Sequence, residues 1–166
     1  EQGRILKVIE DGSVKATYSY DNLQKDNDGT YESVVETVTY ANGGVAKTIT
    51  NGSDQIISVK DETVSGNIET TYEYDNNGQV ICEKYSDGSG IKYDYDVDGY
   101  QIRKSTYDAI DSKNAAKVTE YTYDTEGNIL KAVDKKMGTP YRYTYYEYDS
   151  YGRNISVAEV NASSEP

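Results

Sequence analysis

Short stretches in which tyrosine alternates with a polar residue recur along the chain, and each is followed by a turn sequence. Four of them read Y-x-Y-D-x-x-G, at residues 72–78, 93–99, 121–127 and 146–152. Alternation with a period of two places both tyrosines on one face of a strand and the residue between them on the other. Asp and Gly at these positions favour a tight turn, because Asp accepts a backbone hydrogen bond and Gly adopts positive φ. Each copy therefore predicts a strand that ends in a hairpin turn.

These copies define the positions that we expect to have structural roles in the repeat. They are Tyr72, Tyr74, Asp75, Gly78, Tyr93, Tyr95, Asp96, Gly99, Tyr121, Tyr123, Asp124, Gly127, Tyr146, Tyr148, Asp149 and Gly152.

A second strand is predicted after each turn. In the first clear copy, residues 79–85 read QVICEKY, and a turn at 86–90 brings the chain to the next tyrosine pair. Each repeat thus predicts two antiparallel strands, and successive repeats should pair into a meander. An aliphatic residue stands two positions after the Gly in three copies, at Ile5, Val80 and Ile129. Gln101 and Asn154 fill that place in two others, with Ile102 and Ile155 one residue later, so we expect an extra bulge there.

The N-terminal half carries weaker copies of the same pattern. Residues 18–24 read YSYDNLQ, with Gln24 in the place of Gly, and residues 38–44 read VTYANGG, with Ala41 in the place of Asp. The opening Glu1-Gln2-Gly3 resembles the tail of a further copy. We predict one array over residues 1–160, with about seven partial or whole repeats, degenerate over 1–70 and clear over 71–155, and a tail at 161–166. About a dozen antiparallel strands are expected, with no helix beyond a turn near Asp108–Ala116.

Composition fits a thin sheet rather than a thick core. The chain has nineteen tyrosines and no Phe or Trp. Tyrosine favours strands, covers much apolar area and keeps a polar tip, so it suits a sheet whose faces are partly wet. The net charge of −12 argues against binding to nucleic acid and to anionic membrane surfaces, which select for Lys and Arg. No apolar run is long enough to predict membrane insertion.

The Y-x-Y-D-x-x-G consensus, with an aliphatic residue soon after the Gly and a period in the twenties, resembles the YD repeats of the Rhs family. The resemblance implies an all-β fold, an antiparallel meander of YD-repeat β-hairpins that forms a long, twisted or curled sheet. It also implies a secreted or cell-surface location in bacteria. Arrays of this family occur in large surface proteins, in the shells that encase polymorphic toxins, and in the teneurins of animals. The expected function is a non-catalytic structural segment of such a protein, and the alternative is a carbohydrate-binding module.

Catalysis is not expected. The chain has no histidine, which removes the commonest general base and most metal ligation. Its one cysteine, Cys82, stands on a predicted strand without a partner that would activate the thiol. The recurring Asp positions are explained as turn residues rather than as paired catalytic carboxylates. We therefore predict no enzyme activity and no cofactor.

Calcium is an alternative for one acidic stretch. Asp94, Asp96 and Asp98, followed by Gly99, reproduce the first half of a calcium loop, and residues 26–29 echo it. A complete loop would place a bidentate Glu where this chain has Ser105. Since Asp96 and Gly99 are also turn residues, a surface calcium ion is the weaker interpretation.

Tyrosine rows are the candidate binding surface. Tyr141, Tyr143 and Tyr145 should lie on one face of a strand, and Tyr146 and Tyr148 on the other. Exposed rings can stack on sugar C–H faces, whereas the structural interpretation is that they form cross-strand pairs within the sheet.

The two ends of the array should be open sheet edges, near Arg4–Ile9 and Arg153–Val160. Unpaired N–H and C=O groups on such edges favour pairing with neighbouring repeats of the parent protein, or self-association.

Overall fold

The computed structural model describes residues 3–25, 32–63 and 66–164. The described residues form thirteen strands and one short 3-10 turn, η1 (Ala162–Ser164). The chain divides into two compact units, Glu1–Asp87 and Gly88–Pro166. No helix in the described part of the chain is long and apolar enough to cross a membrane.

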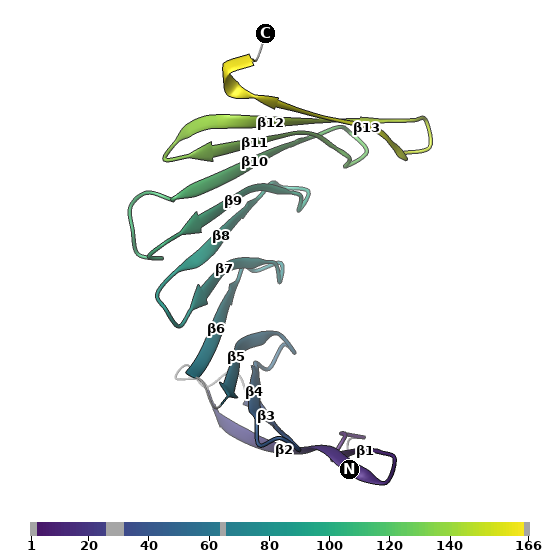
Figure 1. The fold of residues 1–166 in the computed structure, drawn as a ribbon, viewed down its shortest axis with the longest axis vertical. Coiled ribbons are helices and arrows are strands. Elements are labelled where there is room, and N and C mark those ends of the chain that lie inside the picture. Colours follow the sequence, from purple (N-terminus) through teal and green to yellow (C-terminus); the bar gives the residue numbers. More distant parts are fainter. Residues whose placement is uncertain (1–2, 26–31, 64–65, 165–166) are drawn as a thin grey trace. The chain divides into compact units, whose positions relative to one another are not determined.

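Each unit is an antiparallel meander in which the strands lie in chain order (Figure 1). The described residues of the first unit form β1 (Lys7–Glu10), β2 (Ser13–Lys25), β3 (Glu32–Tyr40), β4 (Val45–Thr50), β5 (Ile56–Thr63), β6 (Gly66–Tyr74) and β7 (Val80–Tyr85). Those of the second unit form β8 (Gly90–Tyr95), β9 (Gln101–Tyr107), β10 (Lys117–Tyr123), β11 (Ile129–Lys136), β12 (Thr139–Tyr148) and β13 (Asn154–Asn161). The predicted fold class, an all-β antiparallel meander of hairpins, is confirmed. Residues 108–116 form turns, as expected.

The four predicted hairpin turns are all present and share one hydrogen-bond pattern. At Asp124, the backbone N–H of Gly127 donates to the Asp124 carbonyl (3.3 Å), and the N–H of Asp124 donates to the Asn128 carbonyl (3.0 Å). The Asp124 carboxylate accepts the N–H groups of Glu126 and Asn128, both at 2.9 Å. Asp75, Asp96 and Asp149 accept the corresponding pairs of N–H groups. The closing glycines all have positive φ: 83° at Gly78, 89° at Gly99, 88° at Gly127 and 74° at Gly152.

A fifth turn of this kind lies between β4 and β5, where the sequence reads Asn51-Gly52-Ser53-Asp54. The Asn51 side-chain oxygen accepts the N–H groups of Ser53 and Gln55, both at 3.0 Å. Asp54 takes the place of the closing glycine, with φ of 59°. Asn and Asp can take these two turn positions because both side chains form hydrogen bonds with nearby backbone groups, and because both residues adopt left-handed φ values. Sequence inspection missed this copy, since neither signature residue is present.

The weaker copies follow this turn pattern only in part. Asp21 lies within β2, opposite Val35, and not in a turn. No Gly follows three residues later, so the strand continues. The turn after Tyr40 is built differently, because the Asn42 side chain accepts the N–H of Gly44 at 3.0 Å. The described Gly3 has φ of 63°, whereas Glu1 and Gln2 lie outside the described residues.

A β-bulge follows each of the five turns, and not only the two copies where we expected one. In the β10–β11 pair, Thr122 lies opposite Lys131 and Tyr123 opposite Ile129, so Leu130 is the extra residue. The register shifts in the other copies leave the same position unpaired. That position, three residues after the end of the turn, is aliphatic every time: Ile57, Ile81, Ile102, Leu130 and Ile155. The bulge therefore belongs to the repeat itself.

The interior is thin. Among the described residues, the apolar side chains that count as buried are Ala16, Val38, Cys82, Ile110 and Ala132. None of the larger described side chains is fully buried. Ile110, at 4% exposed, anchors the 108–116 segment, and its N–H donates to the Gly88 carbonyl at 2.8 Å. Stability must therefore come from half-buried tyrosines and hydrogen bonds more than from a dry core.

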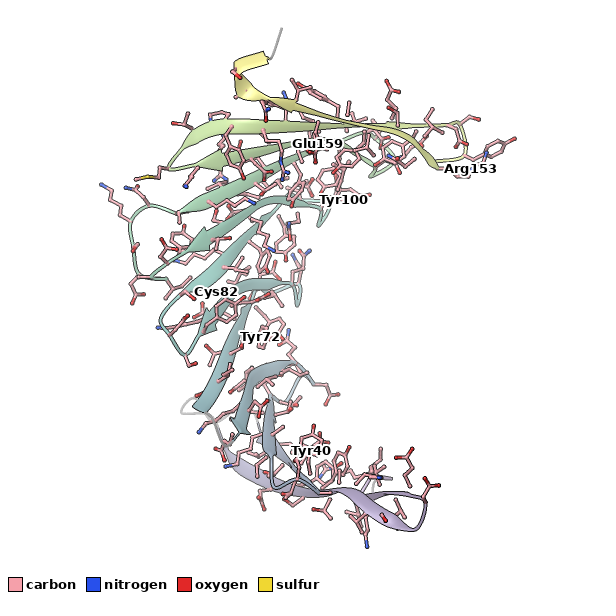
Figure 2. All side chains as sticks on the ribbon, in the orientation of Figure 1. Tyr40, Tyr72, Cys82, Tyr100, Arg153 and Glu159 are labelled. Atoms are coloured by element: carbon pink, nitrogen blue, oxygen red, sulfur yellow. The ribbon has the colours of Figure 1, made fainter. Side chains whose placement is uncertain are left out.

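Gly127 has a second constraint besides its φ. A Cβ atom at this position would lie 2.4 Å from the Tyr100 hydroxyl oxygen and 2.7 Å from Cζ of the same ring. The Tyr100 ring, labelled in Figure 2, stacks on that of Tyr123. The ring centroids are 5.1 Å apart and the ring planes make an angle of 27°. Any side chain at residue 127 would displace Tyr100 from this stack. Gly152, with the same sign of φ, has no contact closer than 3.9 Å for a Cβ atom.

We predict that Gly127→Val lowers the free energy of unfolding by about 1–3 kcal/mol, because valine is strained at positive φ. Gly152→Val should suffer the same backbone strain without the clash, so its loss should be smaller by about 1 kcal/mol, the scale of an aromatic pair. Urea denaturation measures both. In a Tyr100→Ala background the difference between the two variants should disappear. Equal losses in the wild-type background would mean that the Tyr100 contact contributes nothing.

Candidate functional site

Tyrosine hydroxyls join neighbouring hairpins at four places in the described residues. The second tyrosine of a repeat donates its hydroxyl to the carbonyl of the residue that lies two positions after the preceding turn. Four such bonds are Tyr20 to Ile5 (3.0 Å), Tyr74 to Ile56 (2.7 Å), Tyr123 to Gln101 (2.7 Å) and Tyr148 to Ile129 (3.0 Å). Burial raises the pKa of Tyr74 and Tyr123 above the ordinary tyrosine value. We call these four bonds the tyrosine ties.

The five tyrosines predicted as a binding row do not share one environment. Lys131 lies over the rings of Tyr143 and Tyr145, with its Nζ at 4.5 and 5.1 Å from the ring centroids. Tyr141 is 41% exposed and is the extra residue where the β11–β12 register shifts. Tyr148 makes a tyrosine tie, and Tyr146 lies on the opposite face of β12 from Tyr145, as alternation predicts. Their use as a sugar-binding row stays a prediction.

Alternating charges cross four strands of the second unit on one face. Arg103 Nη1 lies 3.6 Å from Asp94, and Arg103 Nη2 lies 3.1 Å from Glu120. Lys135 Nζ then lies 2.6 Å from the other oxygen of Glu120. The hydrogen bond from Lys135, with help from Arg103, holds the pKa of Glu120 below its usual value against the effect of burial. We call Asp94, Arg103, Glu120 and Lys135 the first charge ladder.

A second charge ladder lies on the other face, shifted by two strands. It runs from Lys117 on β10 to Asp134 on β11, Arg142 on β12 and Glu159 on β13. Asp134 is 6% exposed. Its carboxylate accepts hydrogen bonds from the Thr119 hydroxyl (2.7 Å) and from Arg142 Nε (2.7 Å). Burial alone would raise the pKa of Asp134, but these bonds and the charges of Lys117 and Arg142 outweigh it and lower that pKa.

Two shallow hollows lie over these ladders. The larger, with a volume of about 700 Å³, lies between the 108–116 segment and the sheet, and Arg103, Glu120 and Lys135 line its floor. The smaller, of about 380 Å³, lies over Asp134, Arg142 and Glu159. In both hollows the central charges are already paired with one another, which favours a structural role for them.

The acidic stretch proposed for calcium is engaged in other contacts. Asp94 belongs to the first charge ladder, and one oxygen of Asp96 accepts the N–H groups of Asp98 and Tyr100. Across the described ranges, no group of three or more His, Cys, Asp or Glu side chains is placed to hold a metal ion. The similar stretch at 26–29 lies outside the described residues. Cys82 is buried on β7, opposite Glu73, as a packing residue would be.

Comparison with protein-family models and with curated proteins finds no match. The fold does match solved structures. The structure of the Photorhabdus luminescens Tc holotoxin pore matches with a TM-score of 0.55 and 14% identity over 93% of this chain. Crystal structures of TcdB2-TccC3-TEV and TcdB2-TccC3-Cdc42 match with TM-scores of 0.54 and 0.50, both at 14% identity, over 92% and 93% of this chain. This chain covers 11% of each matched chain. The resemblance to YD repeats is thus confirmed at the level of the fold.

We predict that acid weakens the second unit partly through Asp134. Its pKa is lowered in the folded chain, so its contribution is present above the ordinary value of 3.8 and is lost as the pH falls through the folded pKa. Asp134→Asn should cost about 1–3 kcal/mol at pH 7, because a hydrogen-bonded charged partner of Arg142 is removed. The variant should also lose less stability than the wild type as the pH falls below about 3.8.

Denaturant titrations at several pH values measure this difference. Asp61→Asn is the matched control, since Asp61 is exposed and occupies the same place after its own turn, seven residues beyond Asp54. It should change stability by less than about 0.5 kcal/mol. Equal pH profiles for Asp134→Asn and the wild type would contradict the role assigned to this carboxylate.

Proposed function

We propose that the chain is a non-catalytic structural segment of a larger YD-repeat protein, secreted by or displayed on bacteria. The observation that carries this proposal is the repetition of the tyrosine ties. The same hydroxyl-to-carbonyl bond joins hairpins at Tyr20, Tyr74, Tyr123 and Tyr148. The side chains that recur in every repeat are thus used to join one hairpin to the next, which is the property that a wall built from repeats requires.

The contacts of the carboxylate side chains support a structural role. The recurring Asp carboxylates cap turns, Glu120 and Asp134 belong to the charge ladders, and Glu62 is paired with Lys47 and Lys60. The matched structures are of toxin complexes, and each matched chain is far longer than this one. Neighbouring repeats of a parent protein are therefore the proposed partners, and the net charge of −12 argues against nucleic acid.

Carbohydrate binding receives less support from these contacts. Lys131 already lies over the rings of Tyr143 and Tyr145, and Tyr148 makes a tyrosine tie. A sugar would have to displace a cation–π contact to stack on that side of the two rings.

Removal of one whole repeat tests the structural proposal. Deletion of residues 96–123 joins Tyr95 directly to the next turn, Asp124–Gly127, and removes two strands with their turns. Because repeat proteins are stabilised by each repeat and its neighbours, the shortened chain should keep its β-sheet circular dichroism. It should unfold with a smaller urea m-value, since less surface is exposed.

A deletion that removes one strand provides the control. Loss of residues 96–116 fuses β8 directly to β10 and destroys the alternation of strand direction, so the second unit of this chain should fail to form its sheet. The first deletion and the full chain should also turn over no glycoside, peptide or ester substrate. If both deletions abolish the sheet equally, or if the full chain shows an activity that a single Asp or Glu substitution removes, the structural proposal fails.

A further inference from the structure

The outer side of β13 is an exposed edge with a mixed apolar and acidic surface. Within the described residues, β13 pairs with β12 and with no other strand. Ile155 is 64% exposed and Val157 56% exposed, and the side chain of Glu159 is 60% exposed. Unpaired main-chain groups on such an edge accept a further strand. The repeat makes it possible to derive which strand would fit.

The neighbouring β11–β12 pair provides the register. Arg142, six residues before Tyr148, lies opposite Asp134, seven residues after Gly127. In the same pair, the Tyr148 hydroxyl donates to the carbonyl of Ile129, two residues after Gly127. Strand β12 thus makes two contacts with β11, the ion pair of Arg142 and the tyrosine tie of Tyr148.

The same two acceptors are present on β13. Glu159 comes seven residues after Gly152, in the position of Asp134. Asn154 comes two residues after Gly152, in the position of Ile129, whose carbonyl accepts the Tyr148 hydroxyl. Figure 2 shows Glu159 on β13, the last strand of the unit. The edge therefore repeats the acceptor side of the β11–β12 pair without its donor.

The charge order of the second ladder points to a cation as the next member. It alternates Lys117, Asp134, Arg142 and Glu159, and it ends on the exposed acid. Lys117 is also six residues before the tyrosine of its own repeat, Tyr123. In the first unit, Ile68 takes this place opposite Asp61. In the β9–β10 pair, Thr106 lies opposite Lys117, so the charged pair at this position is that of Asp134 and Arg142.

We propose that the outer edge of β13 is a docking site for one antiparallel strand that carries Lys or Arg six residues before a Tyr. The cation pairs with Glu159, and the tyrosine hydroxyl donates to the Asn154 carbonyl. This proposal rests on the proposed structural function and specifies the kind of partner strand. A second copy of the chain does not fit: β13 contains no Lys or Arg to face Glu159, and β1 contains no Tyr.

A synthetic peptide with the sequence of β12, residues 139–148, tests this with the full-length chain. It should bind, with amide chemical-shift changes in β13, as followed by NMR and by fluorescence anisotropy of the labelled peptide. Replacing the peptide's arginine by Glu should weaken binding by about two- to fivefold, the scale of a cross-strand charge pair. Replacing its last tyrosine by Phe should weaken binding by a similar factor.

Charge reversal on the protein provides the decisive control. Glu159→Lys should weaken the original peptide and restore the Arg→Glu peptide, whereas Asp61→Lys, in the equivalent position of the first unit, should change neither. The proposal is overturned if the peptide does not bind or if neither charge change alters its affinity. It is also overturned if the chemical-shift changes are confined to β1, or if the chain forms a dimer through β13. None of these outcomes alters the result of the repeat deletion, which tests the structural function separately.

Discussion

The described residues of each unit form a sheet without a second layer packed on it, so both faces of the sheet remain partly open to water. The rest of the structure depends on this constraint. Large apolar side chains would remain half exposed, and the buried apolar residues that the described chain does contain are mostly small. Tyrosine meets this condition because its ring covers the sheet while its hydroxyl finds a partner. The tyrosine ties, the capped turns and the charge ladders all add polar contacts across strands. Stability is thereby distributed along the repeat.

Turn chemistry could be predicted because it depends on residues that are close together in sequence. Asp124 and Gly127 act within five residues of each other, and the same holds for the other clear copies. The turn at Asn51 was missed because Asn and Asp54 perform the same functions with different residues. The bulge was expected in the Gly99 and Gly152 copies, from the residue two positions after the Gly, and it occurs there and in the other three copies as well. The third residue, aliphatic in every copy, is the one that bulges.

The candidate site was harder to predict because it depends on register between strands. Alternation correctly separates Tyr145 from Tyr146, but it does not show that Lys131 lies over two of the rings. Likewise, no local pattern identifies Asp134 as a buried carboxylate between Lys117 and Arg142. These contacts follow from which residues the bulges bring opposite one another. The charge ladders are therefore visible only once the pairing of strands is known.

The hydroxyl-to-carbonyl bonds between hairpins should stabilise a sheet that has little interior. Removal of a single hydroxyl oxygen tests this directly. Tyr123→Phe keeps the ring and its stack on Tyr100 but removes the bond to the Gln101 carbonyl. Urea denaturation should show a loss of about 0.5–1.5 kcal/mol. Tyr121→Phe, on the same strand face and without a described hydroxyl bond, should change stability by less than about 0.5 kcal/mol. Equal effects of the two substitutions, or no loss in Tyr123→Phe, would contradict the account.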